Sequence, residues 1–280
     1  MANIKLVTDS SAGLTDEEIK EYDITIVPLS VMIDDQVYVE REDITNDEFV
    51  AKMAESTNLP KTSQPPLGKF VEVFDRLGAD GSQVLCIDMM ASLSGTVHAA
   101  EQAATMTETD VTVIDSLTTD RALAYQLIEA AKAIKAGATM EEVVAKARET
   151  EKKTTLYLAI DNVKNLVAGG RVSKFAGTLS GVLNIKPMLK VGNGEIEIPA
   201  KVRGNKGMHK LWSQIVADMV KGPEIVAIGI SHVAAGKEME WLKAQLNEAF
   251  PDIPVLVRTT VPVIATNTGF GANCLIYYTK

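Results

Sequence analysis

Short runs of apolar residues, many of them β-branched, recur along the first half of the chain. Residues 4–7, 84–89 and 111–114 are each followed by a polar loop and then by a segment with helical periodicity. A buried strand that alternates with a helix in this order is typical of parallel βαβ units. We therefore expect the first half to form an α/β domain with a mainly parallel sheet.

Helix starts are indicated by a Thr-x-x-Glu spacing, in which the threonine and glutamate side chains each bond the other residue's backbone N–H. This spacing occurs at Thr15 and Glu18, at Thr45 and Glu48, and at Thr139 and Glu142. It predicts helices that begin near residues 16, 46 and 140. Gly137 is expected to end the helix before the last of these, over residues 122–136.

The pattern changes after Lys152. Residues 154–160 are typical of a strand, and Asn193-Gly194 between two apolar runs is a strong hairpin signal. Strands over 225–230, 255–257 and 274–278 and a helix over 237–249 complete this half. We predict two α/β domains, 1–153 and 154–280, the second with a mixed sheet that includes a hairpin.

Composition and charge narrow the function classes. The 280 residues carry a formal net charge of −9, which argues against broad nucleic-acid binding because phosphate contacts need a basic face. Cys86 and Cys274 are too few for a disulfide framework, and neither a signal peptide nor a membrane span is evident at the N-terminus. These features favour a cytoplasmic protein that does not span a membrane.

Ser92-Leu93-Ser94-Gly95-Thr96 is the segment most suggestive of chemistry, since it joins a predicted strand to an alanine-rich helix. The first backbone N–H groups of a helix lack intrahelical partners, and its dipole is positive at that end. An anion fits such a loop. Two other features are compatible with the same role: the hydroxyl-rich segments 8–11, 62–66 and 115–116, and Arg171, which Gly169-Gly170 would release from a short helix.

Several nucleotide and hydrolase signatures are missing. The chain lacks Gly-x-x-x-x-Gly-Lys-Ser/Thr, lacks Gly-x-Gly-x-x-Gly after the first strand, and lacks Gly-x-Ser-x-Gly around Ser94. The histidines are His98, His209 and His232; His98 suits a packing or surface role, and His232 is a possible site residue. No metal-ligand spacing and no cofactor motif is found. An enzyme with Ser94 as nucleophile therefore has no evident base.

Taken in order along the chain, five segments resemble the DegV family of bacterial fatty-acid-binding proteins, of the FakB type. They are Thr8-Asp9-Ser10-Ser11, Lys61-Thr62-Ser63-Gln64-Pro65, Leu93-Ser94-Gly95-Thr96, Gly169-Gly170-Arg171-Val172-Ser173-Lys174 and Lys201-Val202-Arg203-Gly204. The resemblance spans the whole chain, and the ordered set is specific although each motif alone is not.

The resemblance implies a protein without catalytic residues, metal or cofactor that encloses one long-chain fatty acid between its two domains. It would present the carboxylate to a separate ATP-dependent fatty-acid kinase, which forms an acyl phosphate for phospholipid metabolism. By the same resemblance, the carboxylate is bound by Thr62, Ser63, Ser94, Gly95 and Asn267. Arg171 and Arg203 are expected at the opening, where ligand and kinase meet. Leu93, Phe175, Leu179, Leu183, Ile185 and Phe270 are candidates for the apolar tunnel.

The chain departs from the family pattern near its C-terminus. Where the family commonly has His-x-Gly-Pro-Gly, this sequence has Asn267-Thr268-Gly269-Phe270-Gly271. Histidine can carry a positive charge near neutral pH, whereas asparagine can only form hydrogen bonds. Two alternatives to the kinase-coupled carrier follow: a lipid-binding protein uncoupled from the kinase, or a serine-dependent enzyme that acts on a small acid or ester.

Overall fold

The computed structural model describes residues 3–171 and 185–280. The first half of the chain forms a four-stranded sheet in the order β2-β1-β6-β7, and every pairing in it is parallel. The mainly parallel sheet predicted for this half is thus confirmed. Its strands are β1 (Ile4–Asp9), β2 (Ile24–Val27), β6 (Gln83–Asp88) and β7 (Val111–Asp115).

Helices cover both faces of the parallel sheet, which is why its central strands are almost continuously apolar. On one face, Phe70 and Phe74 of α3 and Ala100 of α4 pack against Val7 and Val84. On the other face, α5 and α6 pack against β1 and β6. These helices are α1 (Asp16–Tyr22), α3 (Leu67–Gly78), α4 (Thr96–Ala104), α5 (Asp120–Lys135) and α6 (Met140–Lys152).

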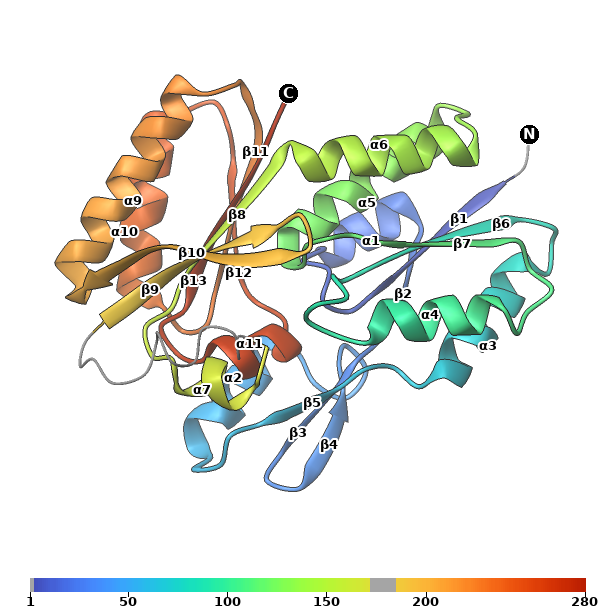
Figure 1. The fold of residues 1–280 in the computed structure, drawn as a ribbon, viewed down its shortest axis with the longest axis horizontal. Helices are drawn as coiled ribbons and strands as arrows, with labels where there is room; N and C mark the ends of the chain where they lie inside the picture. Colours follow the sequence, from blue (N-terminus) through green and yellow to red (C-terminus); the bar gives the residue numbers. More distant parts are fainter. Residues whose placement is uncertain (1–2, 172–184) are drawn as a thin grey trace.

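The second half forms a six-stranded mixed sheet in the order β10-β9-β8-β13-β11-β12 (Figure 1), in agreement with the mixed sheet predicted there. Asn193 and Gly194 make the predicted hairpin turn, with φ of 52° and 74°. The strands are β8 (Thr154–Ala159), β9 (Ile185–Gly192), β10 (Glu195–Arg203), β11 (Ile225–His232), β12 (Val255–Thr259) and β13 (Asn273–Thr279).

Helix α5 lies between the two large sheets and belongs to the core of each. Its Leu123 and Leu127 pack with the parallel sheet, while Ala122 and Tyr125 pack with β8 and β13. The opposite face of the six-stranded sheet is covered by α9 (Gly204–Lys221) and α10 (Gly236–Ala249), seen together at the left of Figure 1. Two shorter helices, α7 (Lys164–Ala168) and α11 (Pro262–Thr268), pack together below this sheet.

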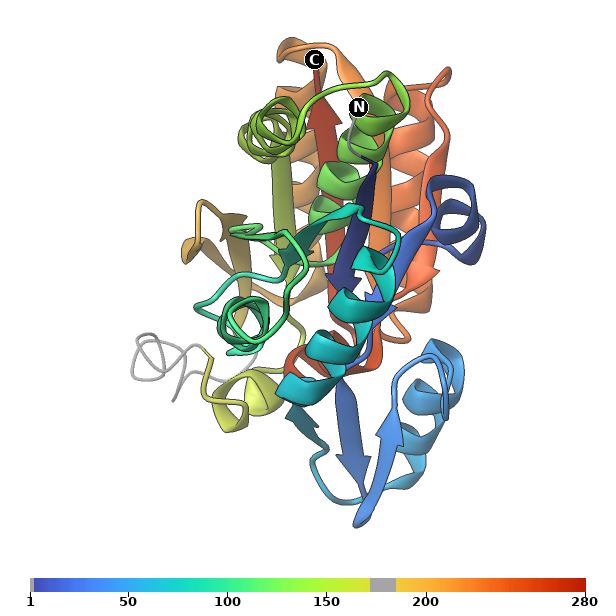
Figure 2. The ribbon, with the colours of Figure 1, turned by 90° about the vertical axis from the view of Figure 1, so that its right-hand side faces the viewer.

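A small antiparallel sheet, which the sequence pattern did not predict, projects from one end of the molecule (Figure 2). Its order is β4-β3-β5, and α2 packs on it. The segment 62–66, expected to be a loop, contributes Thr62 and Ser63 to its edge strand. The elements are β3 (Ser30–Ile33), β4 (Gln36–Val39), β5 (Lys61–Ser63) and α2 (Asn46–Glu55).

The three predicted capping boxes are present at the starts of α1, α2 and α6. The boundary predicted near residue 153 falls between α6 and β8; the division into two domains stays a prediction.

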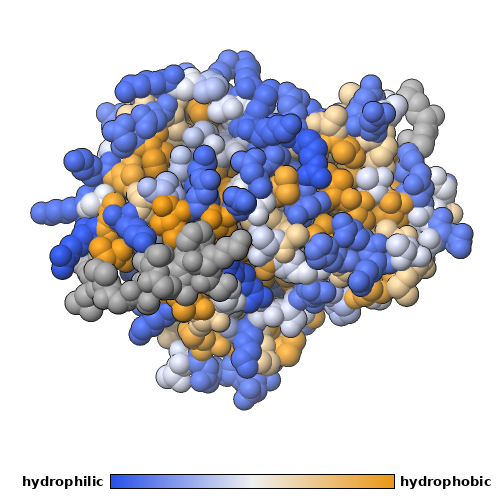
Figure 3. Space-filling model, in the orientation of Figure 1, coloured by the Kyte–Doolittle hydropathy of each residue, from blue (hydrophilic) through white to orange (hydrophobic). Residues whose placement is uncertain are grey.

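Hydrophilic residues occupy most of the outline of the face shown in Figure 3, with hydrophobic residues between them. Within the described ranges, no helix has the length and apolar character needed to cross a membrane.

Candidate ligand cavity

A cavity of about 620 Å³ lies where the parallel sheet, the six-stranded sheet and the small antiparallel sheet approach one another. Its size is in the usual range for small-molecule sites. The walls are mostly aliphatic and come from strands, helices and loops of both halves. They are formed by Leu29, Met89, Leu93, Leu156, Leu158, Leu166, Leu189, Val191, Ile196, Val233, Val263, Ile264, Ala272 and Cys274.

One end of the cavity has a polar mouth. Thr62, Gln64, Ser92, Ser94 and Arg171 all line it, and each is at least partly exposed. The hydroxyl-rich loop after β6 and the arginine that follows Gly169-Gly170 therefore line the same cavity. The other two hydroxyl-rich segments, 8–11 and 115–116, do not line the cavity.

Arg171 is held at the mouth by three hydrogen bonds. Its Nη1 donates to the Gly169 carbonyl at 2.6 Å, its Nε to the Leu93 carbonyl at 3.4 Å and its Nη2 to Thr62 Oγ1 at 3.4 Å. Helix α7 ends at Ala168, and Gly170 has φ of 74°, so the two glycines do release the arginine from the helix. A cationic fork and a hydroxyl thereby face the same opening.

Ser94 lies beside this pair at the start of α4. Its Oγ is 2.8 Å from Thr96 Oγ1 and accepts a hydrogen bond from the Thr96 backbone N–H at 3.3 Å. Gly95 provides room for Gln64, because a Cβ on this glycine would collide with Gln64 Oε1. Because Gly95 has no side chain, the Ser94 hydroxyl and the Gln64 amide can both lie at the cavity.

The hydrogen bonds do not favour Ser94 as a nucleophile. His98, one helical turn further on, has an exposed side chain and pairs with Glu101 instead. Across the residues that the structure describes, no histidine forms a hydrogen bond with Ser94. Among the described residues, Ser94 forms its hydrogen bonds with Thr96, which is not a general base of the kind that activates a hydroxyl nucleophile.

Asn267, which stands where the family commonly has histidine, also lines the cavity. Its Nδ2 donates to the Val263 carbonyl one turn earlier in α11, at 2.8 Å. Its Oδ1 faces Gly169, where a Cβ would clash with it. The amide is thus fixed between α11 and the end of α7, and it adds no charge to the mouth.

Two further residues expected at the site are not among the cavity walls. Ser63 is exposed on β5 next to Thr62, and Arg203 is exposed at the end of β10. Of the tunnel candidates, Leu93 lines the cavity, whereas Ile185 and Phe270 do not. Val172, Ser173, Lys174, Phe175, Leu179 and Leu183 lie outside the described residues.

The cavity lining has a second polar region, a feature only partly anticipated from the sequence. Thr119, Asp120, Ser231, His232 and Thr260 line it, and of these only His232 was a candidate. Ser231 and His232 end β11 and Thr260 follows β12, two adjacent parallel strands. The tendency of ligand sites to form at the carboxyl ends of parallel strands was the signal that could have found them.

Three buried carboxyl groups lie behind the cavity rather than in it. Burial is the main reason that the pKa of Asp9, Asp88 and Glu40 is raised, that of Glu40 to about 8. Asp9 accepts hydrogen bonds from the backbone N–H groups of Ser11 and Met89, which fixes the loops after β1 and β6. In the described ranges, no group of His, Cys, Asp and Glu side chains is arranged to hold a metal ion.

The DegV family model matches residues 3–280. The chain belongs to the DegV family. A DegV domain-containing protein of Streptococcus pneumoniae is 42% identical over 276 residues, which are 99% of this chain and 98% of that protein.

Solved DegV structures have the same fold. A fatty acid binding DegV from Bacillus subtilis has a TM-score of 0.89 at 27% identity and covers 100% of both chains. A fatty-acid-binding DegV family protein from Thermus thermophilus has a TM-score of 0.87 at 27% identity, covering 99% of this chain and 100% of its own. The mixed α/β architecture predicted from the sequence is therefore that of DegV proteins described as binding fatty acids.

Proposed function

We propose that this DegV protein binds one long-chain fatty acid and presents its carboxylate to a separate kinase for acyl phosphate formation. The observation that carries the proposal is the cavity itself, which has aliphatic walls and a mouth of hydroxyl groups and one arginine. The solved relatives described as fatty-acid-binding support the same ligand class.

The energetics of such a site divide between tail and head group. Burial of roughly 14 methylenes at about 0.8 kcal/mol each gives on the order of 11 kcal/mol before the cost of association. A hydrogen bond to a charged group adds only about 1.5–3 kcal/mol. The aliphatic walls would therefore set affinity, and the polar mouth would set which end of the ligand faces outward.

At the mouth, the ligand carboxylate would accept hydrogen bonds from Thr62 Oγ1 and Ser94 Oγ, with Arg171 beside it. In the kinase step, a carboxylate oxygen attacks the γ-phosphorus of ATP, a new P–O bond forms, and the bond to the ADP oxygen breaks. Arg171 would offset the negative charge that gathers there. We keep Arg203, exposed on β10, as a contact for the kinase.

Lipid extraction tests the binding proposal. Protein purified from cells is extracted with solvent and analysed by mass spectrometry, and we expect a long-chain fatty acid at close to one per chain. Delipidated protein should then take up added palmitate or oleate. Recovery of no lipid, together with no uptake, would refute the proposal.

The placement of the ligand carboxylate is tested by variants of Thr62 and Ser94 at the mouth, with Ser63 as the control. Thr62→Val and Ser94→Ala each remove a carboxylate donor and should weaken fatty acid binding roughly tenfold, as charged hydrogen bonds are lost. Ser63→Ala is the matched control, because successive strand residues face opposite sides and Ser63 does not line the cavity. An equal loss in all three variants would contradict this placement of the head group.

A carrier uncoupled from the kinase is the second candidate, and Asn267 favours it because its fixed amide cannot supply positive charge. Loaded protein is mixed with a fatty-acid kinase and ATP, and acyl phosphate is measured. Turnover by the wild type supports the coupled carrier. Turnover that appears only in Asn267→His supports the uncoupled one, and covalent labelling of Ser94 by an acylating probe would instead revive a serine enzyme.

A further inference from the structure

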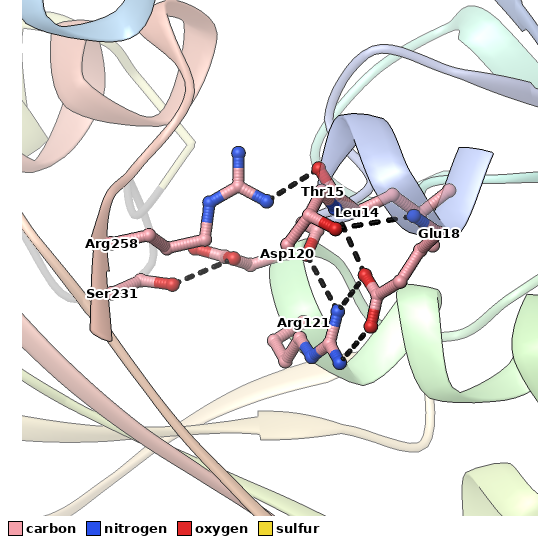
Figure 4. A network of polar contacts seen from close by, with 8 residues as sticks. Leu14, Thr15, Glu18, Asp120, Arg121, Ser231 and Arg258 are labelled. Carbon is pink, nitrogen blue, oxygen red and sulfur yellow. Dashed lines mark hydrogen bonds and ion pairs between the residues drawn. The ribbon is translucent and has the colours of Figure 1, made fainter. Parts of the chain in front are cut away.

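The second polar region of the cavity lining is unsuited to a plain hydrocarbon chain. Asp120, Ser231 and Thr260 all line it, and their exposed fractions are 3%, 2% and 3%. Ser231 Oγ donates to Asp120 Oδ1 and Thr260 Oγ1 to Asp120 Oδ2, both at 2.8 Å. A carboxyl group with two hydroxyl donors thus forms a buried polar wall, in contrast to the aliphatic residues that line the rest of the cavity. Figure 4 shows Ser231 pointing toward Asp120.

Asp120 has capacity for another hydrogen bond. A carboxylate offers about four acceptor positions, and the two hydroxyl donors use one on each oxygen. The wall can therefore accept a hydrogen bond from a ligand at Asp120.

The backbone of Asp120 indicates that this carboxyl group is held in place. Its φ is 53°, in the left-handed region that side chains other than glycine and asparagine or aspartate rarely adopt. Of the two neighbouring arginines, Arg121 donates to Glu18 and Gly13 and Arg258 donates to the Leu14 carbonyl (Figure 4), while Arg258 also interacts electrostatically with Asp120. The carboxyl group of Asp120 is thus left beside hydroxyl groups on the cavity wall.

The chemistry of this wall selects the ligand. A methyl end placed against Asp120 would remove water from the carboxyl group and give nothing back, which is costly for a buried polar group. A second carboxylate on the ligand would bring two acids together, with no donor between them. A ligand hydroxyl can donate a hydrogen bond to Asp120 and so replace the one that water would make.

We propose that the preferred ligand is a hydroxylated long-chain fatty acid, whose distal hydroxyl group donates to the Asp120 carboxyl group. This rests on the proposed function, because the carboxylate at the mouth fixes which end of the chain reaches Asp120. It adds a second recognition point at the buried polar region of the same cavity. The polar wall around Asp120 would then determine the preference for a hydroxylated acid, while the aliphatic walls would contact the hydrocarbon part of any acyl chain.

Competition binding with delipidated full-length protein tests this inference. Palmitate, ω-hydroxypalmitate, stearate and a mid-chain hydroxystearate each displace a fluorescent fatty acid. We expect at least one hydroxylated acid to bind roughly tenfold more tightly than its unsubstituted counterpart. In Asp120→Gly, which suits the positive φ, this preference should fall to near unity, and in Asp120→Asn it should fall partway.

The outcomes separate this inference from the proposed function. Equal or tighter binding of the unsubstituted acids by the wild type overturns the inference and leaves the carrier proposal standing, whereas no binding of any acid overturns both. A preference that survives in both Asp120 variants also overturns it. Asp110→Asn, which removes an exposed acid distant from the cavity walls, should keep the wild-type preference.

Discussion

Glu40 is the residue whose burial has the clearest consequence for stability. It is 1% exposed, and it accepts hydrogen bonds from Ser10 Oγ and from the Val263 backbone N–H at the start of α11. Burial is the largest cause of its pKa of about 8, with the charge of Asp9 adding to it. At neutral pH the folded protein therefore keeps a proton on this group that the unfolded chain would release.

The sign of the resulting pH dependence follows from linkage. The pKa of Glu40 is raised from 4.5 to about 8 in the folded state. The contribution of the protonated group to the free energy of unfolding is therefore fully present below about pH 4.5 and is lost as the pH rises through about 8. We expect Glu40→Gln to remove this pH dependence. Between pH 5 and 8.5, the free energy of unfolding of the variant should therefore rise by a few kcal/mol relative to that of the wild type, at about 1.4 kcal/mol per pKa unit.

Urea unfolding midpoints at several pH values in this range measure the difference between wild type and Glu40→Gln. Glu42→Gln is the matched control, since Glu42 is an exposed acid two residues away. Its profile should match that of the wild type. If the stability of the wild type and of Glu40→Gln changed with pH in parallel, Glu40 would not hold a proton in the folded state.

Sequence reasoning found some residues of the cavity and missed others for a physical reason. Ser94 and Arg171 could be predicted because their local context, a strand-to-helix loop and a glycine pair, is visible in consecutive residues. Asp120 and Thr260 are 140 positions apart and meet only through the tertiary fold. No local pattern distinguishes such an aspartate from an ordinary residue at a helix start.

At the scale of elements, the β9–β10 turn connects the two halves of the chain near the mouth. Gly194 N–H donates to the Leu117 carbonyl at 2.9 Å, and Ser92 Oγ donates to the Gly194 carbonyl at 2.9 Å. The hairpin therefore supports the loop that contains Ser94. Its register depends on a backbone conformation that glycine adopts at no steric cost.

Gly194→Ala should destabilise the protein by about 1 kcal/mol, because φ is 74° and the new Cβ would lie 3.3 Å from Leu117 Cδ2. Calorimetry should show a Tm lower by roughly 2–4 °C. Gly192→Ala, two residues earlier, is the control, since no atom lies within 4 Å of its Cβ. Equal shifts in both variants would rule out backbone strain at the turn as the cause.

The elements that sequence reasoning located and those it missed differ in how local their signals are. The helix starts at residues 16, 46 and 140 are specified by side chains three residues apart, and the structure confirms them. The strands of the small sheet have only three or four residues each. Strands this short contain too little alternation to be recognised, although they place Thr62 at the mouth.

At the scale of the molecule, a ligand that fills the cavity should stabilise the fold. Binding to the folded state alone adds about 2.7 kcal/mol at a ligand concentration of 100 Kd. For a chain of this size that raises Tm by several degrees. We expect palmitate to produce this shift in a thermal melt of delipidated protein.

Two control ligands separate the contributions of head group and tail to this Tm shift. Palmitate methyl ester keeps the tail without the charged carboxylate, so it should give a smaller shift than palmitate at equal concentration. Octanoate keeps the carboxylate with about half the tail, and its shift should be close to zero. A larger shift with the ester than with the acid would contradict the role assigned to the polar mouth.

The position of α5 has a consequence for how quickly a ligand can exchange. Leu123 and Leu127 are part of the core of one sheet, and Ala122 and Tyr125 part of the core of the other, so the sheets cannot separate without exposing both cores. Exposure on that scale costs as much as the whole stability of a typical domain. Release should therefore follow local movement of the mouth, and its rate should respond to substitutions beside Arg171 far more than to urea concentrations below the unfolding transition.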